Sequence, residues 1–189
     1  MAHDAQRTFV QMVKDARPEF FFWTNVIEIG SLNINGTVRD FFSYPNYVGF
    51  DVGKGRDVDY VVPGQDVAYR ENSFDVAITT ECFEHAEAWR TIWWNMVRML
   101  KPGGLIVTTC AGTGRPEHGT TRSDIGSSPL TVALGDEYYQ NLTPADFTDD
   151  LREGLDVRFY ENTVNCDLYA WGIKGGPGFD LDLDKVEWR

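Results

Sequence analysis

The fold is decided by the stretch Val26-Ile27-Glu28-Ile29-Gly30-Ser31-Leu32-Asn33-Ile34-Asn35-Gly36. An apolar run that ends in an acid is followed by a glycine, by small polar residues and by a second glycine. This layout predicts a buried strand, a tight loop and then a helix. Because open α/β sheets bind ligands at the carboxyl ends of their strands, we interpret the loop as the binding site of a nucleoside cofactor.

Strands and helices alternate on both sides of this loop. Apolar runs predict strands at 26–30, 47–51, 58–62, 74–79 and 105–109. Helical spacing and capping residues predict helices at 5–17, from 35–37 onward with Val38, Phe41 and Phe42 inward, at 87–100, and from Thr143 onward. Two last strands, 156–164 and 167–173, are close enough in sequence for an antiparallel hairpin. The pattern predicts a three-layer α/β sandwich with a mostly parallel sheet.

Composition and charge limit the classes of partner. The 189 residues include 17 Lys and Arg against 29 Asp and Glu, which gives a net charge of −12. Such a surface repels phosphate backbones, so we do not expect nucleic acid as a partner. With 42% hydrophobic residues, the chain can bury one core, and we expect a single domain over 1–189.

The cysteines and the apolar runs indicate the compartment. Cys82, Cys110 and Cys166 are widely spaced and form no metal-binding pattern, so the sequence predicts no metal site and suits a reducing compartment. The N-terminus lacks a signal-peptide core, and no apolar run approaches the length needed to span a membrane. We therefore expect a cytoplasmic protein that does not bind membranes.

Two acids close neighbouring strands. Asp51 follows Glu28 by 23 residues, and an acid about 20 residues after a glycine loop binds ribose hydroxyls in dinucleotide folds. A carboxylate suits this task because it accepts hydrogen bonds from two vicinal hydroxyls. Glu28 precedes the glycine, so it either holds the amides of the loop or faces a cationic group of the ligand. The simpler alternative is that each acid solvates the end of a strand.

The glycine spacing argues against a pyrophosphate ligand. The next glycine after Gly30 is Gly36, so the GxGxxG pattern of NAD and FAD sites is absent, and no GxxxxGK[ST] loop occurs. A nucleoside without phosphates fits these residues better.

Later motifs follow in a definite order: Asn72-Ser73-Phe74-Asp75-Val76-Ala77-Ile78, then Glu81-Cys82-Phe83-Glu84-His85, then Arg98-Met99-Leu100-Lys101-Pro102-Gly103-Gly104. With the glycine loop and Tyr47-Val48-Gly49-Phe50-Asp51, they resemble the motifs of class I S-adenosylmethionine-dependent methyltransferases, close to the methyltransferase type 11 group. The resemblance covers about residues 24–110, the cofactor half.

The resemblance implies a Rossmann-like, seven-stranded sheet with an antiparallel last strand, and S-adenosylmethionine as the cofactor. It implies that Gly30 and Ser31 lie against the methionine part, Asp51 at the ribose and Val52 beside the adenine. It further implies that the segment 66–67 lies near the adenine edge and that 79–80 flank the sulfonium. The predicted cofactor-binding residues are Glu28, Gly30, Ser31, Leu32, Asp51, Val52, Asp66, Val67, Thr79 and Thr80.

Two histidines are the catalytic candidates. A methyl transfer to a hydroxyl or amine needs a group that removes a proton. His85 follows the fourth strand, near the expected methyl group, and His118 lies in the acceptor-side loop 111–142. The alternatives are that His85 caps a helical turn and that His118 is an exposed loop residue.

The sequence therefore predicts methyl transfer to an O or N of a small-molecule or glycan-like acceptor. A catalytically inactive methyltransferase-like binding module and, more remotely, a nicotinamide-dependent oxidoreductase are the alternatives. The acceptor pocket must come from the lead-in 1–23, from the loop 111–142, or from the second subunit of a homodimer. We expect the tail 175–189 to be loosely held unless Trp188 anchors it.

Overall fold

The computed structural model of the chain describes residues 3–188. Met1, Ala2 and Arg189, at the ends of the predicted lead-in and tail, lie outside the described residues. The strands are β1 (Asn25–Ile29), β2 (Asn46–Asp51), β3 (Tyr60–Val61), β4 (Phe74–Thr80), β5 (Leu100–Ala111), β6 (Leu155–Asn162) and β7 (Asp167–Lys174). The α-helices are α1 (Asp4–Ala16), α2 (Trp89–Met99), α3 (Pro129–Ala133) and α4 (Asp149–Arg152).

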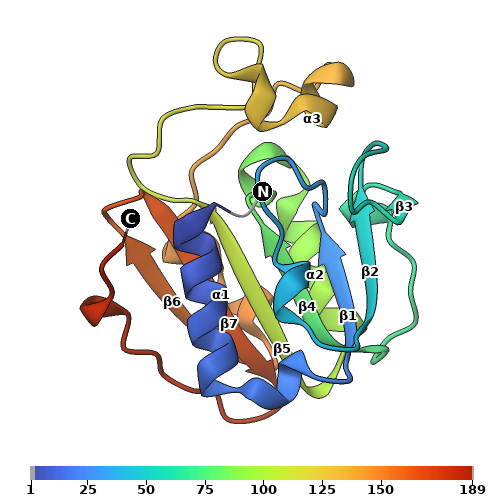
Figure 1. Cartoon of the computed structure of the whole chain (residues 1–189), viewed down its shortest axis with the longest axis vertical. Coiled ribbons are helices and arrows are strands. Elements are labelled where there is room, and N and C mark those ends of the chain that lie inside the picture. The colour runs from blue at the N-terminus through green and yellow to red at the C-terminus, as the bar shows by residue number, and fades with distance from the viewer. Residues whose placement is uncertain (1–2, 189) are drawn as a thin grey trace.

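The seven strands form one sheet in the order β3-β2-β1-β4-β5-β7-β6 (Figure 1). β7 runs antiparallel to both of its neighbours, and all other neighbouring pairs are parallel. The predicted mostly parallel sheet with an antiparallel last strand is confirmed. Because the strand order reverses between β1 and β4, the loops that follow these two strands diverge and leave a crevice at the carboxyl edge.

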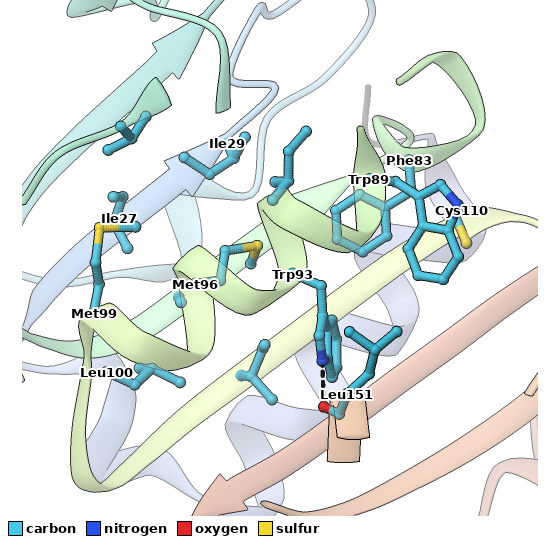
Figure 2. Packing of buried hydrophobic residues seen from close by; sticks show 14 of the residues in the cluster. Ile27, Ile29, Phe83, Trp89, Trp93, Met96, Met99, Leu100, Cys110 and Leu151 are labelled. Carbon is cyan, nitrogen blue, oxygen red and sulfur yellow. Dashed lines mark hydrogen bonds between the residues drawn. The ribbon is translucent and has the colours of Figure 1, made fainter. Parts of the chain in front are cut away.

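The helices cover the two faces of the sheet. α1 turns Phe9, Val10 and Val13 inward, onto a cluster that includes residues of β1, β4, β5 and β7. Figure 1 shows α1 crossing in front of β7. On the opposite face α2 buries Trp89, Trp93, Met96 and Met99 (Figure 2), together with Ile92, whereas Val97, which the spacing also predicts on this face, is only partly buried. The indole nitrogen Nε1 of Trp93 donates to the carbonyl of Leu151 at 2.7 Å, which ties α2 to α4.

The helix predicted from 35–37 onward is wrong, because the segment between β1 and β2 contains only the 3₁₀ turn Arg39–Phe41. The segment has asparagines, a glycine and β-branched residues, all of which are weak helix formers. Helix α1 takes over its hydrogen bonding, since Arg7 donates to the carbonyl of Thr37 and Lys14 to that of Phe41. Backbone acceptors that a helix would have satisfied internally are thus satisfied by side chains.

The helix predicted from Thr143 is also shorter than expected. A 3₁₀ turn, Pro144–Asp146, is followed by Phe147 outside any helix and then by α4. The ring of Phe147 packs 5.0 Å from that of Trp89 and 4.9 Å from that of Trp93, between centroids, and this packing interrupts the helix. The predicted cap is present, because the Asp146 carboxylate accepts from the amide and hydroxyl of Thr143.

Two segments lie outside the layers of the sandwich. The loop after β5 rises above the carboxyl edge and carries α3 at its top (Figure 1). At the other end of the chain, the ring of Trp188 lies 5.4 Å from that of Tyr169 on β7, so the tail is anchored as its sequence allowed. Within residues 3–188, every helix is too short or too polar to cross a lipid bilayer.

Candidate functional site

A cavity of about 440 Å³ opens where β1, β2 and β4 end. Its volume lies in the range of small-molecule sites. Four of the ten predicted cofactor-binding residues line it: Gly30, Leu32, Asp51 and Val52. Six of them do not: Glu28, Ser31, Asp66, Val67, Thr79 and Thr80. The buried carboxyl of Glu28 instead accepts a hydrogen bond from the hydroxyl of Tyr47 at 2.9 Å.

Asp51 is held rigidly at the wall of the cavity. Its Oδ2 accepts from the amide of Leu32 at 2.9 Å, and its Oδ1 accepts from the amide of Val52 at 2.8 Å. Burial raises the pKa of this carboxyl, and the two amides oppose the shift. Each oxygen keeps further acceptor capacity, so the carboxylate can receive two more hydrogen bonds from a vicinal diol.

Gly30 brings the first loop against the segment after β4. Its φ is +77°, in the left-handed region, and a Cβ at this position would lie 2.7 Å from Cβ and 2.9 Å from Sγ of Cys82. Only glycine combines this backbone conformation with so close an approach. The amides of Gly30 and Ser31 both donate to the carbonyl of Phe50, at 2.8 and 3.0 Å, which fixes the loop to β2.

The charged side chains of the cavity wall are acidic. Among residues 3–188, the wall includes four carboxylates and no Lys or Arg; the four are Asp51, Glu81, Glu87 and Asp136. Apolar side chains such as Ile29, Val52, Ile92 and Leu130 complete it. Such a site attracts a cation, repels a pyrophosphate and offers apolar surface to a flat ring.

Glu81, the first residue after β4, was not predicted as a site residue. It lines both this cavity and a second one of about 250 Å³, which His3, Arg115 and His118 also line. Its φ is +51°, its side chain is buried, and its Oε1 has no hydrogen-bond partner among the described residues. Strained backbone of this kind concentrates at functional sites. The sequence signal that could have identified Glu81 is its position just after the strand predicted at 74–79.

These features can be compared with those of known proteins. Residues 48–108 match a family model described as a methyltransferase domain. Over this segment, about a third of its length, the chain is similar to methyltransferases. The residues around the cavity fit S-adenosylmethionine, the cofactor that the resemblance implies: a carboxylate for the ribose diol, apolar side chains for the adenine, and acids around a cationic sulfonium.

Solved structures of methyltransferases share the fold of this chain. Phosphoethanolamine N-methyltransferase 2 of Haemonchus contortus has a TM-score of 0.62 at 13% identity, covering 89% of this chain and 52% of that one. The 1,6-didemethyltoxoflavin-N1-methyltransferase of Burkholderia thailandensis has a TM-score of 0.57 at 13% identity, covering 91% and 88%. The CurJ carbon methyltransferase has 0.60 at 14% identity, covering 90% and 54%. The chain thus spans about half the length of two of these proteins. A search of curated protein sequences gave no match.

The two predicted catalytic histidines come together in the structure. Their ring centroids lie 5.0 Å apart in an edge-on arrangement, although His85 lines the first cavity and His118 the second. Burial, and next the nearby His118, lower the pKa of His85 to about 3. His85 is therefore neutral near pH 7 and a weak base.

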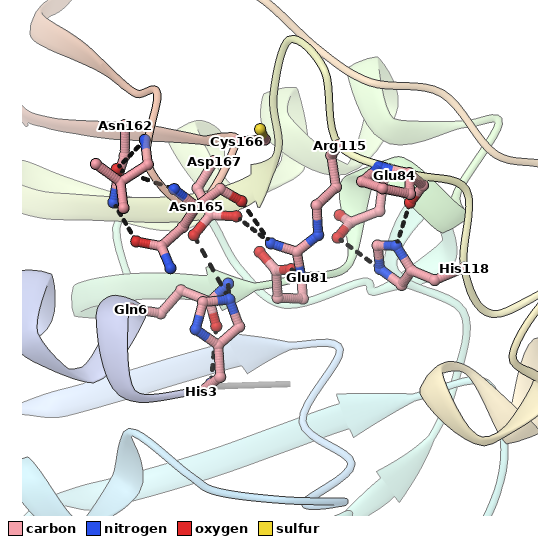
Figure 3. Close-up of polar contacts among 12 residues, drawn as sticks. His3, Gln6, Glu81, Glu84, Arg115, His118, Asn162, Asn165, Cys166 and Asp167 are labelled. Atoms are coloured by element: carbon pink, nitrogen blue, oxygen red, sulfur yellow. Dashed lines mark hydrogen bonds and ion pairs between the residues drawn. The ribbon is translucent and has the colours of Figure 1, made fainter. Parts of the chain in front are cut away.

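An arginine balances two buried acids beside these histidines (Figure 3). Nη1 of Arg115 lies 2.7 Å from Oδ1 of Asp167, and its Nη2 lies 3.7 Å from Oε2 of Glu81. Nη1 also donates to the carbonyl of Asn165 at 2.9 Å. Burial, and next the charge of Glu81, raise the pKa of Asp167 to about 7. Arg115 thus offsets the charges of two buried carboxylates, one of which, Glu81, lines the second cavity.

Proposed function

We propose that this methyltransferase binds S-adenosylmethionine in the 440 Å³ cavity and transfers its methyl group to an O or N of a small-molecule or glycan-like acceptor in the adjoining 250 Å³ cavity. The observation that carries the proposal is the wall of the first cavity, with its four carboxylates and, within residues 3–188, no basic side chain. The same wall argues against the nicotinamide alternative, because a pyrophosphate needs donors or positive charge.

The roles of the residues follow from their positions. Asp51 receives the ribose hydroxyls, Gly30 lets the loop close on the methionine part, and Val52 packs beside the adenine. The cofactor supplies an already activated methyl group, so the protein has to align the donor and the acceptor and take up one proton from a hydroxyl or amine. Glu81, shared by both cavities and with a buried, unpartnered oxygen, is the proton acceptor that we propose.

Cofactor binding tests the first half of the proposal. Asp51→Ala removes two charge-assisted hydrogen bonds to the ribose, of about 1.5–3 kcal/mol each, so affinity for S-adenosylmethionine should fall at least about 100-fold. The matched control is Glu153→Ala, because Glu153 is an exposed acid outside the cavity wall and its loss should change affinity less than about threefold. Calorimetry gives both values, and near-normal affinity of Asp51→Ala would contradict the ribose assignment.

Turnover tests the second half. A panel of hydroxyl- and amine-bearing small molecules and oligosaccharides is screened by release of S-adenosylhomocysteine. Glu81→Gln should bind the cofactor but lower kcat about 100-fold or more, as loss of a general base does. Cofactor binding without turnover on any acceptor class would favour the inactive binding module instead.

Two predictions from the sequence concern the setting of the enzyme. We propose a cytoplasmic location and a homodimer whose second subunit completes the acceptor pocket. Light scattering with and without S-adenosylmethionine tests the dimer, and a monomer in both conditions would contradict it.

A further inference from the structure

Three side chains of metal-ligand type converge on the wall between the two cavities. Glu84 and His85 belong to the 3₁₀ turn Phe83–His85 that follows β4, and His118 belongs to the loop after β5. One ligand atom from each lies within 4.8 Å of the other two. Oε1 of Glu84 and Nε2 of His118 are 3.9 Å apart, and Figure 3 shows the two side chains pointing toward one another.

This cluster is buried and lacks hydrogen-bond partners. Glu84 is 0% exposed, and neither of its carboxylate oxygens has a hydrogen-bond partner within residues 3–188. The Nδ1 of His85, which is 5% exposed, is buried and unpartnered as well. Buried polar atoms are almost always paired, so three unpaired ones around a single point indicate a missing ligand.

The orientation of the third ligand shows which charge is missing. Nδ1 of His118 lies 3.1 Å from the carbonyl oxygen of Pro116, which only accepts, and 3.1 Å from the hydroxyl of Tyr139, which can accept or donate. In the tautomer that donates from Nδ1 to the carbonyl, the lone pair of Nε2 faces Glu84. A carbonyl that holds the outer nitrogen is the usual support of a metal-binding histidine. Two electron-pair donors that face one another across 3.9 Å suit a cation between them.

We propose that Glu84, His85 and His118 bind a divalent transition-metal ion. Two imidazoles and one carboxylate favour Zn²⁺ or Mn²⁺ over Mg²⁺ or Ca²⁺, which prefer ligand sets made of oxygen. If each ligand atom moves toward the centre of the cluster by less than about 1 Å, it lies about 2.0–2.2 Å from an ion there. Three protein ligands leave an open coordination position for a water or an oxygen of the acceptor.

A comparable cluster on the other side of Glu81 does not qualify. His3, Glu81 and Asp167 also bring ligand atoms within 4.8 Å of one another. There, however, Arg115 pairs with both carboxylates, so the positive charge is already supplied. This contrast makes His3 the matched control for His118.

The ion site also joins two parts of the chain. The segment around Gly119 presses on the turn after β4, because a Cβ on Gly119 would lie 2.6 Å from Cε1 of His85. An ion held by His85 and His118 would fix the acceptor-side loop above the cofactor cavity. That consequence for catalysis rests on the proposed function, whereas binding of the ion does not.

Metal titration without cofactor tests the site. Protein stripped with a chelator is titrated by calorimetry with Zn²⁺ and, separately, with Mn²⁺. We expect one ion per chain, an affinity loss of at least about 100-fold in His118→Ala, and unchanged affinity in His3→Ala. Absence of binding in the unmodified protein, equal affinity in His118→Ala, or loss of binding in His3→Ala would each overturn the proposal.

Thermal unfolding gives a second measurement that does not depend on activity. Saturating Zn²⁺ should raise the Tm of the unmodified protein and of His3→Ala, but not that of His118→Ala or Glu84→Gln. A rise in all four would overturn the assignment of the ligands. Affinity of the stripped protein for S-adenosylmethionine, measured in parallel, keeps failure of the ion site distinct from failure of the methyltransferase assignment.

Discussion

Replacement of one buried acid should change how stability depends on pH. Glu28 lies in β1 with 3% of its surface exposed, and its carboxyl accepts a hydrogen bond from the hydroxyl of Tyr47. Burial raises the pKa of its carboxyl from 4.5 to about 7, although the Tyr47 hydrogen bond opposes the shift. The folded protein therefore holds this proton at pH values where the unfolded chain has already released it.

The sign and size of the effect follow from linkage. A group with a raised folded-state pKa stabilises fully below pH 4.5, and this contribution is lost as pH rises toward 7. The full shift corresponds to about 3 kcal/mol, of which about 2.5 kcal/mol is lost between about pH 5 and about pH 8. Glutamine stays neutral and can still accept from Tyr47, so Glu28→Gln should not lose this stability.

Urea unfolding at the two pH values measures the difference. The free energy of unfolding of the unmodified protein should fall, from the lower to the higher pH, by about 2.5 kcal/mol more than that of Glu28→Gln. Glu153→Gln, a change at an exposed position, controls for the removal of one charge and should behave like the unmodified protein. Parallel pH curves for Glu28→Gln and the unmodified protein would refute the reasoning.

Two further substitutions test the architecture of the site. Gly30→Ala should lower the free energy of unfolding, measured in urea, by about 2 kcal/mol or more, because the new methyl group overlaps Cys82 and the positive φ is strained for alanine. Gly135→Ala is the control: its φ is +76°, but no atom lies within 4 Å of the new methyl group, so it should cost only about 1 kcal/mol. Equal losses in the two variants would contradict the overlap with Cys82. Arg115→Met should cost about 3–5 kcal/mol, since it removes the guanidinium charge that offsets the buried Asp167 carboxylate, and a loss below about 1 kcal/mol would show that the pair is not needed.

The sheet could be predicted because its strands are nearly continuous apolar runs. Val26, Val76 and Val107 are all fully buried, and no other element suits so short and apolar a segment between turns. The place of Asp51 at the cavity wall could be predicted for a related reason, since it ends a buried strand at the carboxyl edge of the sheet, whereas its role at the ribose stays a prediction. Local pattern and global fold agree at these positions.

Other features depend on contacts that no local pattern encodes. The segment around Phe41 has helical spacing, yet Arg7 and Lys14 from α1 satisfy its backbone carbonyls and the helix does not form. His85 and His118 were chosen as separate candidates, and only the loop after β5 brings their rings within 5.0 Å. The metal site that we propose could not be predicted either, because His85 and His118 are 33 residues apart and form no recognisable spacing.

The packing of α1 against β7 has a consequence for biosynthesis. The ring of Phe9 stacks 4.5 Å, between centroids, on that of Tyr169, so α1 has one of its partners 160 residues later in the chain. Until β7 has been synthesised, the part of the apolar face of α1 that packs on Tyr169 stays exposed to water or to a chaperone. A nascent chain stalled before Tyr169 would therefore leave an apolar part of this amphipathic helix uncovered.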